Sequence, residues 1–100
     1  MTALNDLAER VERAGADDAN LIREAATALL GSVPDRMNRM LAAEAYESAA
    51  MMLVPEEARV ILNIAEDQIT VAIVAGTQSC GATPALALVA ASLRARSAEL

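Results

Sequence analysis

The sequence predicts one small α+β domain with the order helix, helix, helix, β-hairpin, helix. Three observations lead to this fold class: apolar residues recur every three or four positions over residues 2–53, the spacing changes to two over residues 59–74, and a Thr-Pro pair at 83–84 opens a second helical stretch. A chain of 100 residues has room for one hydrophobic core, and no repeat or linker divides it, so residues 1–100 are expected to form a single domain. Helical stripes before and after one hairpin predict a layered α/β/α arrangement.

The first two helices are marked by residues that favour helix ends. Thr2 can act as the N-cap of a helix that runs to Gly15, and either Asp17 or Asp18 can cap a second helix that runs to Gly31. Because the link between them is short, the two helices are expected to lie antiparallel.

A third helix is predicted from Pro34 to Leu53. Proline suits the first helical position because its missing N–H is not needed there. The apolar stripe in the second half of this segment is regular until Pro55 stops it. Residues 36–39 fit either a helical turn or an irregular segment.

Two runs rich in β-branched residues follow, Arg59–Ile64 and Gln68–Val74. They predict an antiparallel hairpin whose turn, residues 65–67, has no Asn-Gly or Asp-Gly pair to fix the register. Two strands alone are marginally stable in water and leave both outer edges unpaired. We therefore expect a homo-oligomer, a dimer or larger, in which a second copy completes the sheet.

The last helix has the clearest start. Thr83 can cap it with its hydroxyl, and Pro84 takes the first helical position. The first ten positions contain no charged residue. Because a helix that is apolar around most of its circumference is buried on more than one side, this helix is expected to pack between the sheet and another element.

The segment Gly76–Thr83 follows a predicted strand and matches the phosphate-loop pattern G-x-x-x-x-G-K-[ST] except at one position. That position is Ala82, where the pattern needs the lysine that contacts the outer phosphates, so nucleotide hydrolysis is not expected. A weaker use of the same geometry is an anion held on the backbone amides of Gly81, Ala82 and Thr83, with Arg59 as an additional positive charge. The alternative is a connection without a ligand, in which glycine re-aims the chain from strand to helix.

The residue types present exclude several kinds of enzyme. The chain has no histidine, so neither Cys80 nor any serine has an imidazole base to activate it. The acidic pairs lie at predicted turns and helix ends, where Asp and Glu have structural roles. We therefore expect a protein that is not an enzyme, with no catalytic residue, cofactor or metal.

Charge and hydropathy limit the partners in the same way. The net charge of −6 argues against a nucleic-acid partner, because such surfaces need clustered positive charge. No uncharged apolar run reaches the roughly 18 residues of a membrane span. A single cysteine and the lack of a signal-peptide pattern favour the cytoplasm.

Three segments agree, in order, with one known family. Residues 81–96 read G-A-T-P-A-L-A-L-V-A-A-S-L-R-A-R, residues 45–55 read A-Y-E-S-A-A-M-M-L-V-P, and residues 7–14 read L-A-E-R-V-E-R-A. They are similar to the A-A-T-P-A-L-A-L-C-A-A-x-L-R-A-R ending, the A-S-L-D-A-A-x-x-L-V-P segment and the opening helix of small phage and prophage proteins with the phage ABA sandwich domain. The resemblance implies an α/β/α fold and a phage origin, and the family has no assigned biochemical role. The family's G-P-D-R-E-L-D segment and its tryptophans after L-V-P are missing here, so any function of those residues is not expected.

These observations lead to two functional hypotheses. The first is a non-enzymatic protein, encoded by a phage or prophage, that acts by self-association and by binding an unidentified host or phage protein, either in the host cytoplasm or in the virion. The second is an oligomeric counter-defence protein that sequesters a small anionic ligand such as a nucleotide.

Overall fold

The fold was obtained as a computed structural model, which describes residues 3–54, 58–64, 70–74 and 76–98. The elements are α1 (Ala3–Arg13), α2 (Ala19–Leu30), α3 (Asp35–Ala42), α4 (Tyr46–Met51), β1 (Val60–Ile64), β2 (Thr70–Val74), β3 (Thr77–Gly81) and α5 (Pro84–Ala98). The predicted α+β class is confirmed. The last helix has the predicted start at Pro84, and the predicted strands lie at β1 and β2.

The three strands form an antiparallel meander in the order β1-β2-β3. Val60 of β1 lies opposite Val74 of β2, which in turn lies opposite Thr77 of β3. The prediction of a two-stranded hairpin was therefore wrong, because the segment 77–81 is a strand and not only a connection. Its sequence, T-Q-S-C-G, has one β-branched residue, so its intrinsic preference for a strand is weak. The strand forms because it pairs with β2 and packs against α5.

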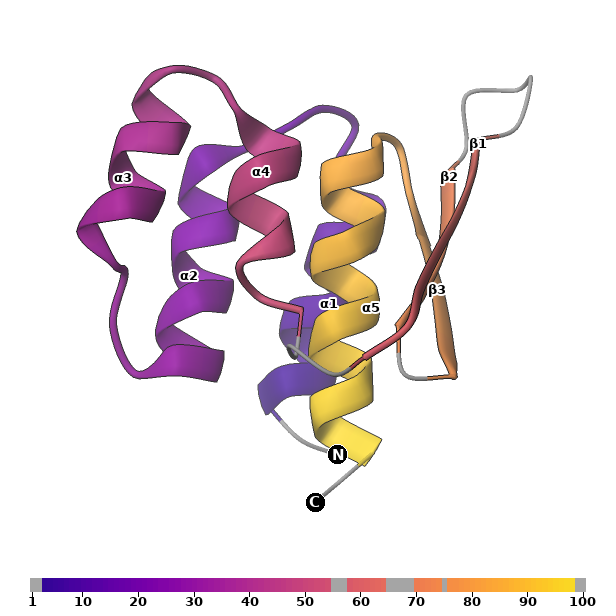
Figure 1. The fold of residues 1–100 in the computed structure, drawn as a ribbon. Helices are drawn as coiled ribbons and strands as arrows, with labels where there is room; N and C mark the ends of the chain where they lie inside the picture. The colour runs from indigo at the N-terminus through magenta and orange to yellow at the C-terminus, as the bar shows by residue number, and fades with distance from the viewer. Residues whose placement is uncertain (1–2, 55–57, 65–69, 75, 99–100) are drawn as a thin grey trace.

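All described helices lie on one face of the sheet (Figure 1). Helix α5 packs on β2 and β3 and also contacts α1, α4 and α2, so it lies between the sheet and other helices, as predicted. Helix α1 also contacts β3 directly. The expected second helical layer on the other face is not supplied by the described residues. The α/β/α prediction is corrected to helices over one sheet face, because α5 returns from β3 across the same side that α1 already occupies.

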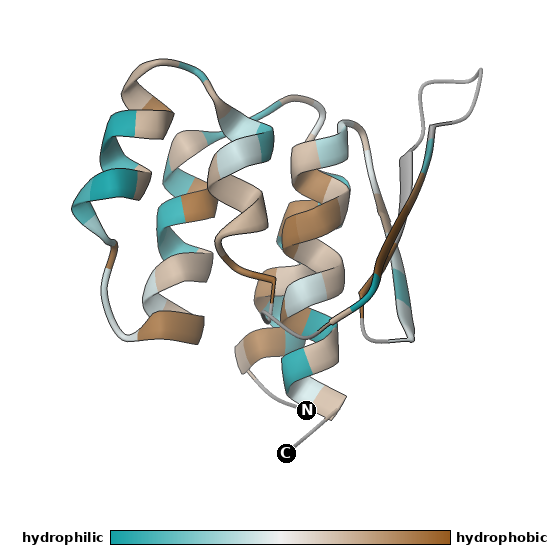
Figure 2. Ribbon diagram, viewed as in Figure 1, coloured by the Kyte–Doolittle hydropathy of each residue, from teal (hydrophilic) through white to brown (hydrophobic). Residues whose placement is uncertain are grey.

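The core is built around α5. Leu86, Val89, Ala90 and Leu93, which have the spacing of one helical face, are fully buried. Of the other six buried residues of α5 four are alanine, which lets neighbouring elements approach closely (Figure 2). The buried residues of α5 are Ala85, Leu86, Ala87, Leu88, Val89, Ala90, Ala91, Ser92, Leu93 and Ala95. Where β3 crosses α5 there is no room for a side chain: a Cβ on Gly81 would lie 2.6 Å from the backbone nitrogen of Ala87. Glycine is therefore required there by space.

Helix α2 has both of its predicted ends. Of the two candidate caps, Asp18 is the one used: its Oδ1 accepts hydrogen bonds from the backbone N–H groups of Asn20 at 2.9 Å and Leu21 at 3.3 Å. Gly31 closes the helix with φ of 85°, in the left-handed region that favours glycine. The predicted cap of α1, Thr2, lies outside the described residues.

The predicted third helix, 34–53, is two helices with a break between them. Glu44 has φ of 59°, and two reversed hydrogen bonds end α3: Ala45 N–H to the Met40 carbonyl at 2.8 Å and Glu44 N–H to the Leu41 carbonyl at 3.1 Å. This is the Schellman pattern, which normally has glycine at the left-handed position. The prediction of one continuous helix was wrong because a glutamate gives no sequence signal for this ending.

Candidate functional site

The N-terminus of α5, predicted as a weak anion site, is occupied by side chains of the protein itself. The Thr83 hydroxyl accepts a hydrogen bond from the Leu86 N–H at 3.1 Å and donates one to Oδ1 of Asp17 at 2.5 Å. Thr83 is thus the predicted cap, and the loop before α2 brings a carboxylate to the positive end of the helix dipole. An anion on Gly81, Ala82 and Thr83 would meet this carboxylate, which disfavours the hypothesis.

Arg59 does not lie beside that helix end. In the strand register, Gly81 pairs with Thr70, which pairs with Ile64, whereas Arg59 precedes Val60 at the opposite end of β1. Five-residue strands separate these two ends by about 13 Å at roughly 3.3 Å per residue. The structure therefore brings Gly81, Ala82 and Thr83 together and leaves Arg59 apart from them.

A charged cluster ties α1, β3 and α5 together. Glu12 of α1 accepts two hydrogen bonds from the Arg94 guanidinium, Nε to Oε2 at 2.9 Å and Nη2 to Oε1 at 2.5 Å, and a further one from the Ser79 hydroxyl. Ser79 is buried, and the Glu12 and Arg94 side chains are 20% and 30% exposed. This paired, fork-like geometry orients the three elements relative to one another.

The cluster shifts the acidity of both charged partners. The hydrogen bonds from Arg94 hold the pKa of Glu12 below its ordinary value, and the Ser79 hydroxyl acts in the same direction against the opposing effect of burial. The same pairing raises the pKa of Arg94. Both groups are therefore held in their charged forms. A pair that stays charged is suited to holding helices and strands together, and not to donating or accepting protons in a reaction.

The sheet edge at β1 is unusually apolar for an edge. Within the described residues β1 pairs only with β2, and it extends beyond the cover of α5, which contacts mainly β2 and β3. Its sequence, V-I-L-N-I, contains no charged residue and no proline. Natural edge strands are usually protected by such residues, so β1 itself lacks these two defences against pairing with another strand.

Two neighbouring side chains of β1 are exposed on opposite faces. Ile61 lies in the cross-strand row of Ile73 and Gln78 and is 44% exposed on the face away from the helices. Leu62 lies in the row of buried Ser79, on the helical side, yet is 39% exposed because α5 does not reach over β1. Apolar surface is thus available on both sides of one strand.

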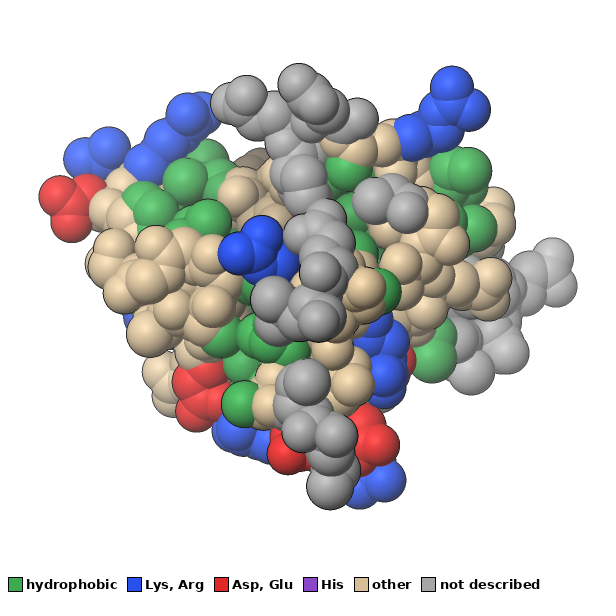
Figure 3. All heavy atoms as spheres, turned by 90° about the horizontal axis from the view of Figure 1, so that it is seen from below, with side chains coloured by type: hydrophobic (Ala, Val, Ile, Leu, Met, Phe, Trp, Pro, Cys, Tyr) green, Lys and Arg blue, Asp and Glu red, His purple; other side chains and the backbone are tan. Residues whose placement is uncertain are grey.

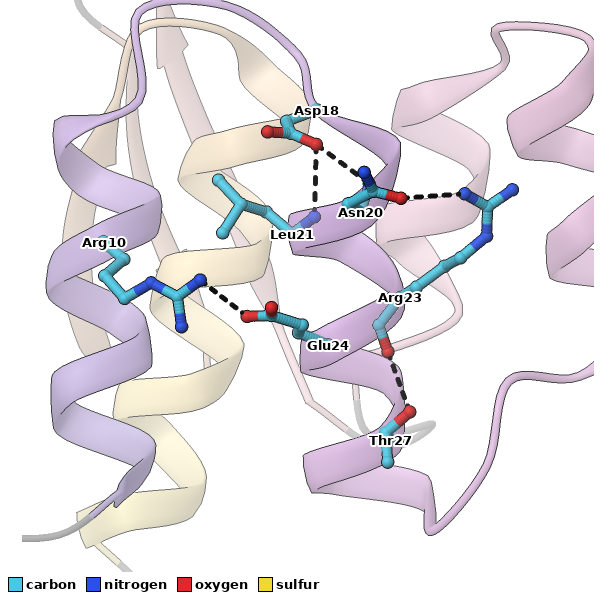
Figure 4. Close-up of polar contacts among 7 residues, drawn as sticks. All are labelled: Arg10, Asp18, Asn20, Leu21, Arg23, Glu24 and Thr27. Carbon is cyan, nitrogen blue, oxygen red and sulfur yellow. Dashed lines mark hydrogen bonds and ion pairs between the residues drawn. The ribbon is translucent and has the colours of Figure 1, made fainter.

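An open groove runs along the solvent side of α2. It has a volume of about 540 Å³ and is lined by Asn20, Arg23, Glu24 and Thr27. Figure 4 shows that the two charged side chains point in opposite directions, Glu24 toward Arg10 of α1 and Arg23 toward Asn20. The four residues that line the groove have the i, i+3, i+4, i+7 spacing of one helix face, but no prediction from the sequence included them.

Other sequence candidates have no site around them. Cys80 is exposed on the sheet face away from the helices. Within the described ranges there is no group of three or more His, Cys, Asp or Glu side chains able to hold a metal ion. Seen from below, hydrophobic side chains reach the surface as separate small patches between charges of both signs (Figure 3).

Two further predictions concern membrane spans and the resemblance to a known family. None of the helices in the described part of the chain combines the length and apolar character needed to cross a bilayer. Comparisons with protein-family models, with curated proteins and with solved structures found no match to the chain. The resemblance to the phage ABA sandwich proteins therefore stays a prediction.

Proposed function

We propose that this protein acts without catalysis, as a self-associating interaction protein that pairs through β1. The observation that supports the proposal most strongly is the β1 edge, where Ile61 and Leu62 are 44% and 39% exposed in a strand without a protecting charge. Two antiparallel copies of β1 give one continuous sheet of twice the width and cover both side chains. On this proposal the partner that completes the sheet is a second copy of the chain.

The strength of this association follows from the size of the surface. Full burial of one Ile or Leu side chain contributes about 1.5–3 kcal/mol, and each of the two residues has less than half of its surface left to bury. Interfaces of this kind fall at the small end of the range for specific complexes. A net charge of −6 on each copy opposes pairing, so we expect weak association that tightens as salt screens the repulsion.

The experiment is sedimentation velocity over a concentration series from about 10 µM to about 500 µM, a range that brackets micromolar dissociation constants. The wild type is expected to shift from the mass of one chain toward that of two. Ile61→Lys should abolish the shift, because it replaces an exposed apolar side chain of the edge strand with a charge, which is a common defence of natural edge strands against pairing. Gln78→Lys is the matched control, since Gln78 is exposed in the same cross-strand row but on β3. A wild type that stays at the one-chain mass throughout contradicts the proposal.

The wider role follows the resemblance described above. We infer a phage or prophage origin, with action in the host cytoplasm or in the virion through a host or phage protein. The charged cluster of Glu12, Ser79 and Arg94 supports a non-enzymatic role, because these polar groups are used in holding elements together. Co-purification of tagged wild type and Ile61→Lys from infected or lysogenic cells tests this role: partners that depend on the paired form are lost from the variant.

A further inference from the structure

The α2 groove is centred on an arginine that is held in place by neutral groups. Arg23 Nε donates to Oδ1 of Asn38 on α3 at 3.2 Å, and Nη1 donates to Oδ1 of Asn20 at 3.4 Å. Arg23 and Asn38 are both half-buried. The guanidinium is therefore oriented by two amide oxygens that leave its positive charge uncompensated.

The neighbouring carboxylates are engaged elsewhere. Glu24, next in sequence, forms an ion pair with Arg10 at 2.9 Å, and Asp18 caps α2 (Figure 4). No carboxylate in the described ranges pairs with Arg23. Of the two charged residues that line the groove, Glu24 is paired with Arg10, so the positive charge of Arg23 is the one without a paired carboxylate in the described ranges.

The donors of Arg23 are only partly used. A guanidinium has five N–H donors in a fixed planar fork, and the two amide contacts occupy two of them. The remaining donors suit the paired oxygens of a carboxylate or phosphate group. Thr27 gives its hydroxyl proton to the Arg23 carbonyl at 3.0 Å and so has only acceptor capacity left for the groove.

We propose that this groove binds the oxyanion group, carboxylate or phosphate, of a small ligand, with Arg23 as the main contact and Asn20 and Asn38 as the positioning residues. The orientation of Arg23 before binding lowers the entropy lost when the ligand is held. The site lies on α2, away from β1, so it does not depend on the proposed self-association, and either proposal can fail alone.

The test is an NMR titration of the full chain at constant ionic strength, with inorganic phosphate in one series and acetate in the other. Saturable shifts of the Arg23 Nε–H and of α2 amides are expected with at least one probe, and the tighter series identifies the preferred oxyanion. Arg23→Gln is expected to weaken binding about tenfold or more, because a charge-assisted contact is lost. Arg36→Gln, which removes an exposed charge on α3, is the matched control and should leave binding unchanged.

A second variant tests the proposal even if the Arg23→Gln protein does not fold. Asn38→Asp retains Arg23 but places a carboxylate against its Nε, so it should neutralise the site and weaken binding to a similar degree. Saturable shifts that disappear in both variants support the proposal. Absence of saturable shifts with both probes, or equal binding by the wild type and Asn38→Asp, overturns it.

Discussion

Replacing Gly81 with alanine adds one methyl group where β3 crosses α5. The new Cβ would lie 2.6 Å from the backbone nitrogen of Ala87 and 2.9 Å from the carbonyl carbon of Leu86. Neither backbone atom can rotate away as a side chain can, so the strand or the helix has to move. Overpacking of a dense core costs about 1–3 kcal/mol, and contact with two backbone atoms of α5 places this substitution near 3 kcal/mol.

That cost is a large part of the stability of a domain of this size, which is about 5–15 kcal/mol. Since each kcal/mol lowers Tm by about 4–8 °C, Gly81→Ala is expected to lower Tm by roughly 10–25 °C. Circular dichroism melts and urea titrations measure both quantities. Gly15→Ala is the matched control, because nothing lies within 4 Å of a Cβ at Gly15, and it should stay within about 0.5 kcal/mol of the wild type. A Gly81→Ala protein as stable as the control would refute the close packing of β3 on α5.

Four further changes test other parts of the structure by urea or thermal unfolding. Because hydrogen bonds from Arg94 lower the folded-state pKa of Glu12, this group stabilises the fold above its unfolded pKa and loses that effect as pH falls through the lower folded value. Glu12→Gln should therefore flatten the decline of stability at pH below the unfolded pKa of glutamate, about 4.3. Ser92→Ala should leave stability unchanged or raise it by up to about 1 kcal/mol, since its buried hydroxyl has no hydrogen-bond partner in the described structure, and a loss above that amount would reveal one. Leu93→Ala should cost about 2–5 kcal/mol because the side chain is fully buried, and a cost below 1 kcal/mol would contradict its place in the core. Glu44→Gly should raise the free energy of unfolding by about 1 kcal/mol by removing strain at φ of 59°, whereas a loss would contradict the Schellman ending of α3.

The parts of the fold that follow local rules were predictable. Thr83 and Pro84 define the start of α5, Asp18 and Gly31 define the ends of α2, and the change to a period of two locates β1 and β2. In each case the signal is a short-range preference of backbone or cap chemistry, which the sequence displays directly.

The parts that depend on tertiary structure were not predictable in this way. The strand β3 has weak intrinsic preference and exists because β2 and α5 surround it. The break at Glu44 places a glutamate where glycine is usual. The first error comes from tertiary contacts that override local propensity, and the second comes from a local helix ending that lacks its usual glycine signal.

The candidate sites also combine local features that were predictable with tertiary contacts that were not. Gly81, Ala82 and Thr83 have the predicted places before α5, but Gly81 is explained by its contact with α5, and Asp17 reaches Thr83 from another part of the chain. The position of Arg59 depends on the strand register, which the turn sequence did not define. In the α2 groove, Arg23 is oriented by Asn38, which lies fifteen residues further along the chain. The sequence therefore contains only the polar helical spacing of the groove residues and no signal for this contact.

The central claim, pairing through β1, is tested most directly by isotope-filtered NOE spectroscopy on an equal mixture of labelled and unlabelled chains. Cross-chain NOEs from the methyl groups of Ile61 and Leu62 to β1 of the other copy are predicted, and they should vanish on dilution. Cross-chain NOEs confined to the helices, or none at concentrations where the mass is that of two chains, would contradict pairing through this strand.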